Sequence, residues 1–116
     1  EPTIKKLRTT GRPLMCTEYM AREYGSTFEF CLPIFKKYNI ACYNWGLVAG
    51  RSQTNFNWET ILYLNEERDK GNLVKEGDNL TEPNQWFHDI FRRDGSPYSI
   101  EEITFIKKIL HNKEEQ

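Results

Sequence analysis

The chain has 116 residues, of which 38% are hydrophobic and 28% are charged, and its formal net charge is −1. This length and balance indicate a single folded domain and exclude a largely disordered chain. Nucleic-acid binding normally requires a concentrated basic surface, which dispersed Lys and Arg do not supply, so we predict no nucleic-acid partner. No apolar run is long enough to predict a membrane span or a membrane partner.

Residues 4–8 have the pattern of a helix end, which Gly11 and Pro13 terminate. Residues 14–17 form a short, mostly apolar run that stops at Glu18. Strands that are buried on both faces of a parallel sheet have this composition. We therefore expect a strand here, with a carboxylate at its C-terminal end.

Ser26 and Glu29 have the spacing of a capping box, which predicts the start of a second helix. Pro33 falls inside this helix and is expected to kink or restart it. Residues 40–45 then predict a second strand. Helix, strand, helix and strand in this order indicate a βαβ unit with a parallel sheet.

The second half of the chain predicts more loop than regular structure. Residues 46–54 read as a loop, residues 58–70 as a helix, and residues 71–83 as an exposed loop rich in turn formers. Residues 94–97 predict a turn. Ser99–Glu102 forms a second capping box, which opens a last helix with one apolar face.

Three cysteines, Cys16, Cys31 and Cys42, are present without a C-x-x-C spacing. This pattern indicates neither a disulfide framework nor a zinc site, and each cysteine is expected to act as a small buried hydrophobe. His88 lies in an aromatic run and is expected to be structural, while His111 is remote from it in sequence. We therefore predict no metal and no cofactor.

Glu18 is the most informative residue, because it is a carboxylate at the end of a predicted parallel strand. Ligands of α/β sheets and barrels bind at this edge, and catalytic residues project from it. An unpaired buried charge is costly. Two interpretations are therefore open: Glu18 belongs to a functional site, or it forms a local ion pair with Arg12 or Arg22.

Several segments carry a distinctive pattern and stand in order along the chain, namely RPLMCTEYMAR at 12–22, GSTFE at 25–29, YNWGLVAGRSQT at 43–54, WFHDIF at 86–91 and DGSPY at 94–98. Together they resemble the closing part of a barrel glycoside hydrolase. The resemblance is to bacterial cellulase-like proteins of the large retaining clan that includes endoglucanases, mannanases and β-galactosidases. It is interrupted at residues 57–82, which we interpret as a variable insertion.

The resemblance implies that residues 1–116 are one partial domain, the C-terminal portion of a TIM (β/α)8 barrel with about strands 7 and 8 and their helices. Glu18 matches the catalytic nucleophile that ends strand 7. Trp45 matches the aromatic floor of the sugar site that ends strand 8. Further substrate contacts are expected from neighbouring positions, which are Tyr19, Tyr43, Asn44, Arg51 and Gln53.

A retaining hydrolase also needs an acid/base Glu, which in this clan usually follows an Asn at the end of strand 4. The only Asn-Glu pair here is Asn65-Glu66, in a charged segment that predicts a surface helix. Retaining glycosidases need two carboxyl groups. We therefore expect the chain to be inactive alone.

Three functional hypotheses are open at this point. The first is a fragment of a retaining hydrolase that acts on β-linked glycans, for which family resemblance suggests a secreted or periplasmic location. The second is a non-catalytic carbohydrate-binding module or the folded remnant of a truncated gene, and the third is an unrelated small α/β domain. Because two parallel strands leave exposed edges, we expect the chain to self-associate or to need the rest of a barrel.

Overall fold

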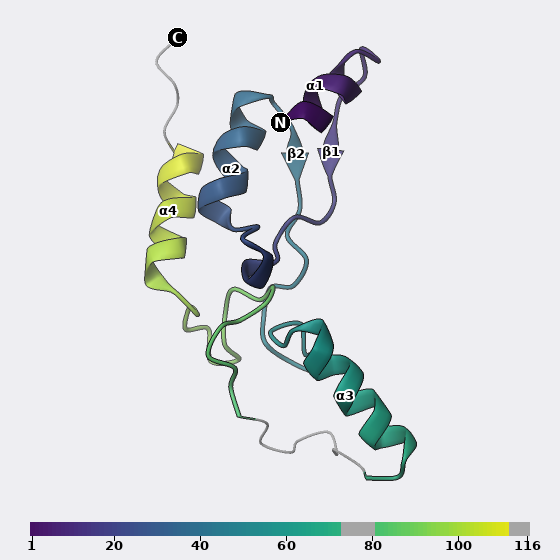
Figure 1. Ribbon diagram of the computed structural model, residues 1–116. Helices are drawn as coiled ribbons and strands as arrows, with labels where there is room; N and C mark the ends of the chain where they lie inside the picture. The colour runs from purple at the N-terminus through teal and green to yellow at the C-terminus, as the bar shows by residue number, and fades with distance from the viewer. Residues whose placement is uncertain (73–80, 112–116) are drawn as a thin grey trace.

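The computed structural model describes residues 1–72 and 81–111, so most of the predicted loop 71–83 lies outside the described residues. None of the helices in the described ranges has the length and apolar character that a membrane crossing requires. The elements, in chain order (Figure 1), are α1 (Pro2–Arg8), β1 (Met15–Cys16), the 3-10 helix η1 (Arg22–Tyr24), α2 (Phe28–Lys37), β2 (Ala41–Cys42), α3 (Trp58–Asp69) and α4 (Ile100–His111).

The two strands form a parallel pair that α2 connects, so the predicted βαβ order is found. Met15 lies opposite Ala41, and Cys16 lies opposite Cys42. The Tyr43 N–H donates to the Cys16 carbonyl oxygen at 2.9 Å, which extends the ladder by one bond. Both strands are shorter than predicted. Each strand has a single neighbour, and the ladder between them ends after this bond.

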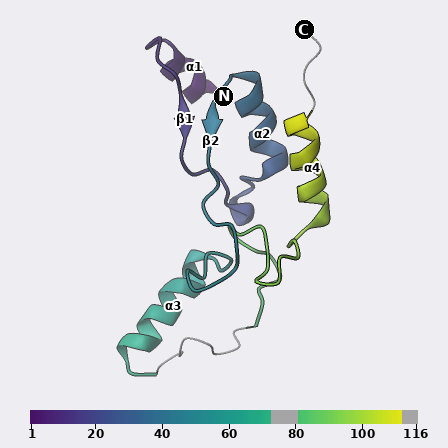
Figure 2. The ribbon, with the colours of Figure 1, turned by 180° about the vertical axis from the view of Figure 1, so that it is seen from behind.

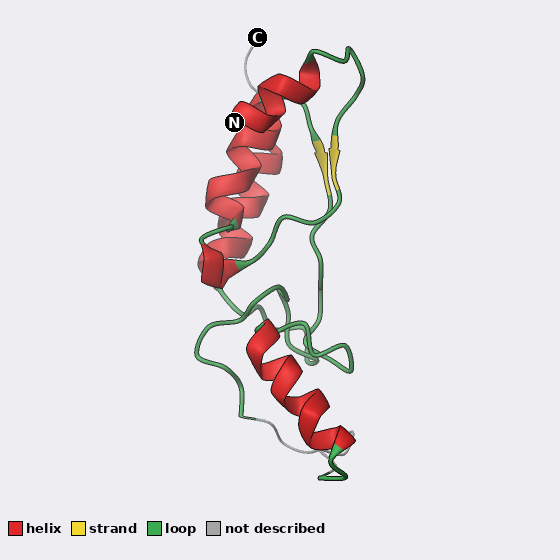
Figure 3. Cartoon of the chain, turned by 45° about the vertical axis from the view of Figure 1, so that its right-hand side comes forward, coloured by secondary structure: helices red, strands yellow, loops and turns green. Residues whose placement is uncertain are grey.

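The helices α2 and α4 lie side by side, and both lie on one side of the sheet (Figure 3). On the other side of the sheet, the described chain places no helix or strand (Figure 3), and Met15 of β1 is 60% exposed. The helix α3 stands apart from these layers (Figure 2). The radius of gyration is 17.3 Å, against about 13 Å for a compact domain of this length, so the molecule is elongated.

The start of α2 differs from the predicted capping box by one residue. The N-cap is Thr27, whose Oγ1 accepts a hydrogen bond from the Phe30 N–H at 3.3 Å. The Ser26 hydroxyl instead donates to the Tyr19 carbonyl oxygen, so it is not available to the helix. Pro33 lies within α2 and does not divide it. Because Pro33 is exposed, its missing N–H affects the solvent side of the helix.

The hydrophobic core lies where the β1–α2 connection, α2, α4 and the segment 86–91 meet. Met20, Phe28 and Ile90 are its buried members. Partly buried side chains surround them, namely Tyr19, Leu32, Phe91, Ile103, Phe105 and Ile106.

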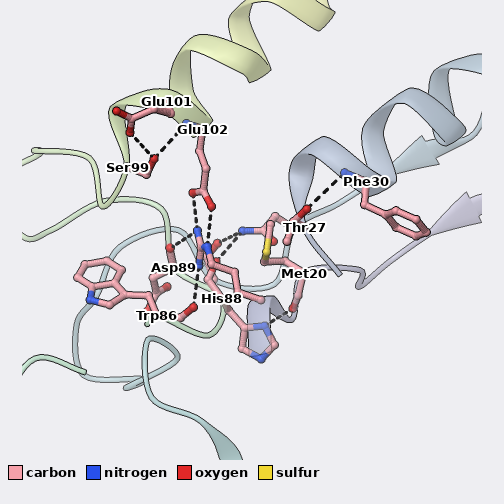
Figure 4. A network of polar contacts seen from close by, with 12 residues as sticks. Met20, Thr27, Phe30, Trp86, His88, Asp89, Ser99, Glu101 and Glu102 are labelled. Atoms are coloured by element: carbon pink, nitrogen blue, oxygen red, sulfur yellow. Dashed lines mark hydrogen bonds and ion pairs between the residues drawn. The ribbon is translucent and has the colours of Figure 1, made fainter. Parts of the chain in front are cut away.

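Within this region, Arg22 and Glu102 form a buried ion pair (Figure 4). The Arg22 Nε donates to Glu102 Oε1 at 2.7 Å, and Nη2 donates to Oε2 at 2.8 Å. Nη1 and Nη2 also donate to the carbonyl oxygens of Trp86 and Asp89. The interpretation of Arg22 as a partner of Glu18 is therefore wrong, because Glu102 occupies its guanidinium.

The same pair corrects the second capping box. The Glu102 N–H donates to Ser99 Oγ at 3.2 Å, which confirms the first half of the motif. The Glu102 side chain does not reach back to Ser99, because it turns inward to Arg22. The Ser99 hydroxyl donates to the Glu101 carboxylate instead, at 2.9 Å.

Replacing Arg22→Met should strongly destabilise the protein, because the Glu102 carboxylate then stays buried without a partner. Loss of one member of a buried pair costs about 3–5 kcal/mol, which urea denaturation followed by circular dichroism measures. The double variant Arg22→Met/Glu102→Met should recover much of this loss, since both charges are then removed.

The matched control is Lys37→Met, which breaks the exposed pair between Lys37 and Glu1. Its unfolding midpoint should stay close to that of the wild type, because water screens this pair. Equal effects of the Arg22 and Lys37 variants would show that the buried pair has no special role.

Candidate functional site

The carboxyl ends of β1 and β2 meet at one edge of the sheet, and Glu18 and Trp45 follow these ends in the chain. Glu18 is exposed, and Tyr43 and Trp45 are 61% and 51% exposed. The Cys16 thiol donates to the Glu18 carbonyl oxygen at 3.3 Å, which ties the residue to the strand that precedes it. The edge therefore presents a carboxylate and two aromatic side chains to solvent.

The loop that follows Trp45 is held by backbone hydrogen bonds to the segment 86–91. The N–H groups of Ile90 and Phe91 both donate to the Leu47 carbonyl oxygen, at 3.1 and 2.9 Å. The Ala49 N–H donates to the Phe91 carbonyl oxygen at 2.8 Å. This part of the loop is therefore attached to the segment that Arg22 anchors.

Asp89 holds the same loop through its side chain and is fully buried. Thr54 Oγ1 donates to the carboxylate and lies 2.9 Å from each of its oxygens. Burial raises the pKa of Asp89, and the hydrogen bond from Thr54 and the charge of His88 oppose that rise. A carboxylate at this depth needs such donors, because desolvation of an unpaired charge is costly.

Gly46 lies directly against Asp89, at the turn that follows Trp45. Its φ is +90°, and a Cβ at this position would lie 2.6 Å from the Asp89 Oδ1. Only glycine combines this backbone conformation with so close an approach. The Asn44 Nδ2 donates to the carbonyl oxygens of Gly46 at 2.6 Å and His88 at 3.2 Å. The Asn44 side chain therefore holds the turn on which Trp45 is carried.

His88 is buried beneath this turn. Its Nδ1–H donates to the Met20 carbonyl oxygen, and its ring packs edge-on to Phe87 with centroids 4.3 Å apart. Burial lowers the pKa of His88, while the bond to Met20 and the charges of Asp89 and Glu18 act in the opposite direction. These contacts fit the structural role predicted for His88. The neighbouring Asp89 carboxylate accepts its hydrogen bond from Thr54.

The remaining predicted site residues have different positions. Tyr19 is half-buried and packs edge-on to Phe28 and Phe35, with ring centroids 6.0 and 5.2 Å away. Burial raises the pKa of the Tyr19 hydroxyl. Arg51 is exposed on the loop after Trp45, and Gln53 adopts a φ of +55° there. Glu18, Tyr43 and Trp45 are thus exposed and follow the ends of β1 and β2, whereas Tyr19 packs against the core.

Asn65 and Glu66 both lie exposed on α3, as expected for a surface pair. The Asn65 Oδ1 accepts a hydrogen bond from Arg68 Nη1 at 3.0 Å within the helix. Across residues 1–72 and 81–111, no three His, Cys, Asp or Glu side chains are grouped so that they could hold a metal ion.

No family model matches the chain, and no curated protein or solved structure is significantly similar to it. The functional argument therefore depends on the residues of the chain itself. Sequence reasoning missed the contact of Thr54 and Gly46 with Asp89. The available signal was the charge of Asp89 inside an apolar run, since a carboxylate buried in such a run requires a hydrogen-bond donor.

Gly46→Ala should displace the turn that carries Trp45, because the new methyl group collides with Asp89 and the positive φ disfavours alanine. We expect a loss of about 1–3 kcal/mol in the free energy of unfolding, together with a changed near-ultraviolet circular dichroism spectrum. Gly50→Ala is the matched control, because the nearest atom to its Cβ is the Val48 carbonyl oxygen at an ordinary 3.5 Å. Similar spectra for both variants would contradict the proposed contact.

The stability of the fold should fall as the pH drops below about 6.5, the ordinary pKa of histidine. The folded state lowers the pKa of His88, so its contribution is present above the unfolded pKa and is lost as the pH falls through the folded pKa. The slope that His88 contributes is at most about 1.4 kcal/mol per pH unit.

His88→Asn retains an N–H donor near Met20 but does not titrate. Urea unfolding of this variant should show a flatter pH dependence than the wild type, since His111 is present in both proteins. An unchanged slope would assign the pH dependence to other groups.

Proposed function

We propose that the chain is the portion of a retaining glycoside hydrolase barrel that carries the nucleophile Glu18 and the sugar-stacking residue Trp45, and that the enzyme acts on β-linked glycans. The observation that carries this proposal is the common position of the two residues, which follow adjacent parallel strands at one edge of the sheet. Tyr43, which directly follows β2, is exposed as well.

The chemistry of these groups suits a pyranose substrate. An exposed indole offers an apolar face against which the C–H groups of a sugar ring pack, while the sugar hydroxyls stay solvated. A carboxylate beside that ring can attack the anomeric carbon and form a glycosyl-enzyme intermediate. In this scheme Trp45 positions the sugar and Glu18 is the catalytic residue, while Asn44 and Asp89 support the turn.

The reaction also requires a carboxylic acid about 5–5.5 Å from the nucleophile, which protonates the leaving oxygen. Asn65-Glu66, the only sequence match to such a group, lies on α3 and is bonded within that helix. We therefore propose that the acid/base comes from another part of a complete barrel and that the isolated chain does not hydrolyse glycosides.

The layer arrangement supports the same proposal. A TIM barrel places its helices outside and packs side chains inside the closed sheet. Here α2 and α4 lie on one side of the sheet, whereas the other side and the outer strand edges lack a cover within the described chain. The remaining strands of the barrel would pair with these edges, and self-association of the chain is the expected substitute in their absence.

A second candidate function is carbohydrate binding without hydrolysis. It is favoured by the exposure of Tyr43 and Trp45, because aromatic side chains can bind a sugar without a second carboxylate. The two functions differ in the role of Glu18, because a binding module uses it at most as a hydrogen-bond acceptor.

The decisive measurement uses a polypeptide in which strands supplied upstream complete the barrel. Glu18→Gln should lower the turnover of an aryl β-glycoside by at least about 10³-fold, because it removes the attacking group and keeps the side-chain shape. Glu29→Gln, an exposed change in the first turn of α2, is the control and should retain wild-type turnover.

Binding to the isolated chain separates the two candidates. If the isolated chain is a carbohydrate-binding module, calorimetry with a series of β-linked oligosaccharides should show binding, and Trp45→Ala should abolish it. Turnover of the completed barrel that does not depend on Glu18 would exclude the hydrolase assignment, and binding that does not depend on Trp45 would exclude both functions.

A further inference from the structure

Three thiols lie close together between the sheet and α2. Cys16 and Cys42 are direct partners across the two strands, and both are half-buried. Met15 and Ala41, which precede them, are exposed. Because successive side chains of a strand point to opposite faces, both thiols lie on the face that α2 covers. Cys31 is buried within α2.

Electrostatics supports this proximity. Burial is the main cause that raises the pKa of Cys42, and the charges of Cys16 and Cys31 raise it further. The Tyr19 hydroxyl interacts with all three cysteines in the same way. All three thiols are free. In the described parts of the chain, no three His, Cys, Asp or Glu side chains are grouped so that they could hold a metal ion.

The pairing of the strands provides the geometry for a bond between two of them. Neighbouring strands of a sheet lie about 4.8 Å apart, and disulfides join Cα atoms about 4.4–6.8 Å apart. Cys16 and Cys42 are in register and on one face, so the spacing of their Cα atoms falls within the range that a disulfide spans. Cys31 belongs to the helix layer, and its Sγ lies 3.4 Å from the Ser26 Oγ.

We propose that Cys16 and Cys42 are a dithiol pair that small-molecule disulfides, such as glutathione disulfide, oxidise to an intramolecular disulfide. One thiolate attacks a sulfur of glutathione disulfide, forms a mixed disulfide and releases one glutathione thiolate. The second thiolate attacks the protein sulfur of that mixed disulfide and releases the second glutathione. Two electrons pass to glutathione, and the two glutathione thiols take up the two protons that the protein loses.

Either sulfur can make the first attack, and the other sulfur then resolves the mixed disulfide. Burial raises the pKa of Cys42 and slows the step in which this thiol reacts, because the thiolate is the nucleophile. Cys31 is excluded from the pair, because it is buried and lies against Ser26.

Oxidation also changes the edge of the sheet. The Cys16 thiol donates to the Glu18 carbonyl oxygen, and the disulfide removes that donor. The backbone that positions Glu18 would then lose one of its anchors to β1. If Glu18 is the nucleophile, its activity should then fall with oxidation. That expectation rests on the proposed function, whereas formation of the disulfide does not.

The test uses the full chain, reduced, then incubated natively with glutathione disulfide, alkylated and digested with trypsin. Cleavage after Arg22, Lys37 and Arg51 puts each cysteine on its own peptide. Mass spectrometry should find one linked pair, which joins the peptide of residues 9–22 to that of residues 38–51. Cys31 should be recovered alkylated, and two of the three thiols should be lost per chain.

Variants and unfolded protein complete the test. Cys31→Ser should form the link as the wild type does, whereas Cys42→Ser should stop at the mixed disulfide. In urea, the wild type should give a mixture of pairings, because the register no longer selects one. The proposal is overturned if the native wild type gives only mixed disulfides, only linked dimers, or pairs with Cys31 as often as the Cys16–Cys42 link. Because no step measures glycoside cleavage, the result stands whether or not Glu18 proves to be a nucleophile.

Discussion

The buried guanidinium of Arg22 donates hydrogen bonds to two distant parts of the chain, the helix α4 and the segment 86–91. It holds the Glu102 carboxylate of α4 and the carbonyl oxygens of Trp86 and Asp89, and its carbon lies 4.7 Å from the centre of the Tyr98 ring. A buried charge is tolerated only with such a complete set of partners. Arg22 therefore joins the β1–α2 connection to the segment 86–91 and to the helix α4.

The candidate site depends on Arg22 indirectly, through Asp89. Arg22 fixes the backbone at Asp89, the Asp89 carboxylate accepts from Thr54, and Gly46 packs against the same carboxylate. Trp45 precedes Gly46 and lies outside the core, so its position is set by these polar contacts more than by apolar packing. Sites of this kind are common on loops, where a rigid scaffold holds residues that stay accessible to a ligand.

The sequence predicted the parts of the structure that are set locally. The apolar periodicity gave the order of the first four elements, and a parallel pair of strands implies that the residues after each strand share an edge. Strand length depends on hydrogen bonds across the sheet, which no local pattern records. The capping assignment at Ser26 failed because Thr27 offers the same chemistry one residue later. The partner of Arg22 lies 80 residues away, and nothing local identifies Glu102 in preference to Glu18.

That separation has a consequence for synthesis. Ribosomes add about 5–20 residues per second, so Glu102 is added about 4–16 s after Arg22, given the 80 residues between them. β1 is complete before the interval begins, and α2 and β2 are synthesised early in it, while the guanidinium of Arg22 still lacks its counter-ion. The nascent chain therefore has to keep Arg22 hydrated until its last helix is made, and closure of the core is a late event in the life of each new molecule.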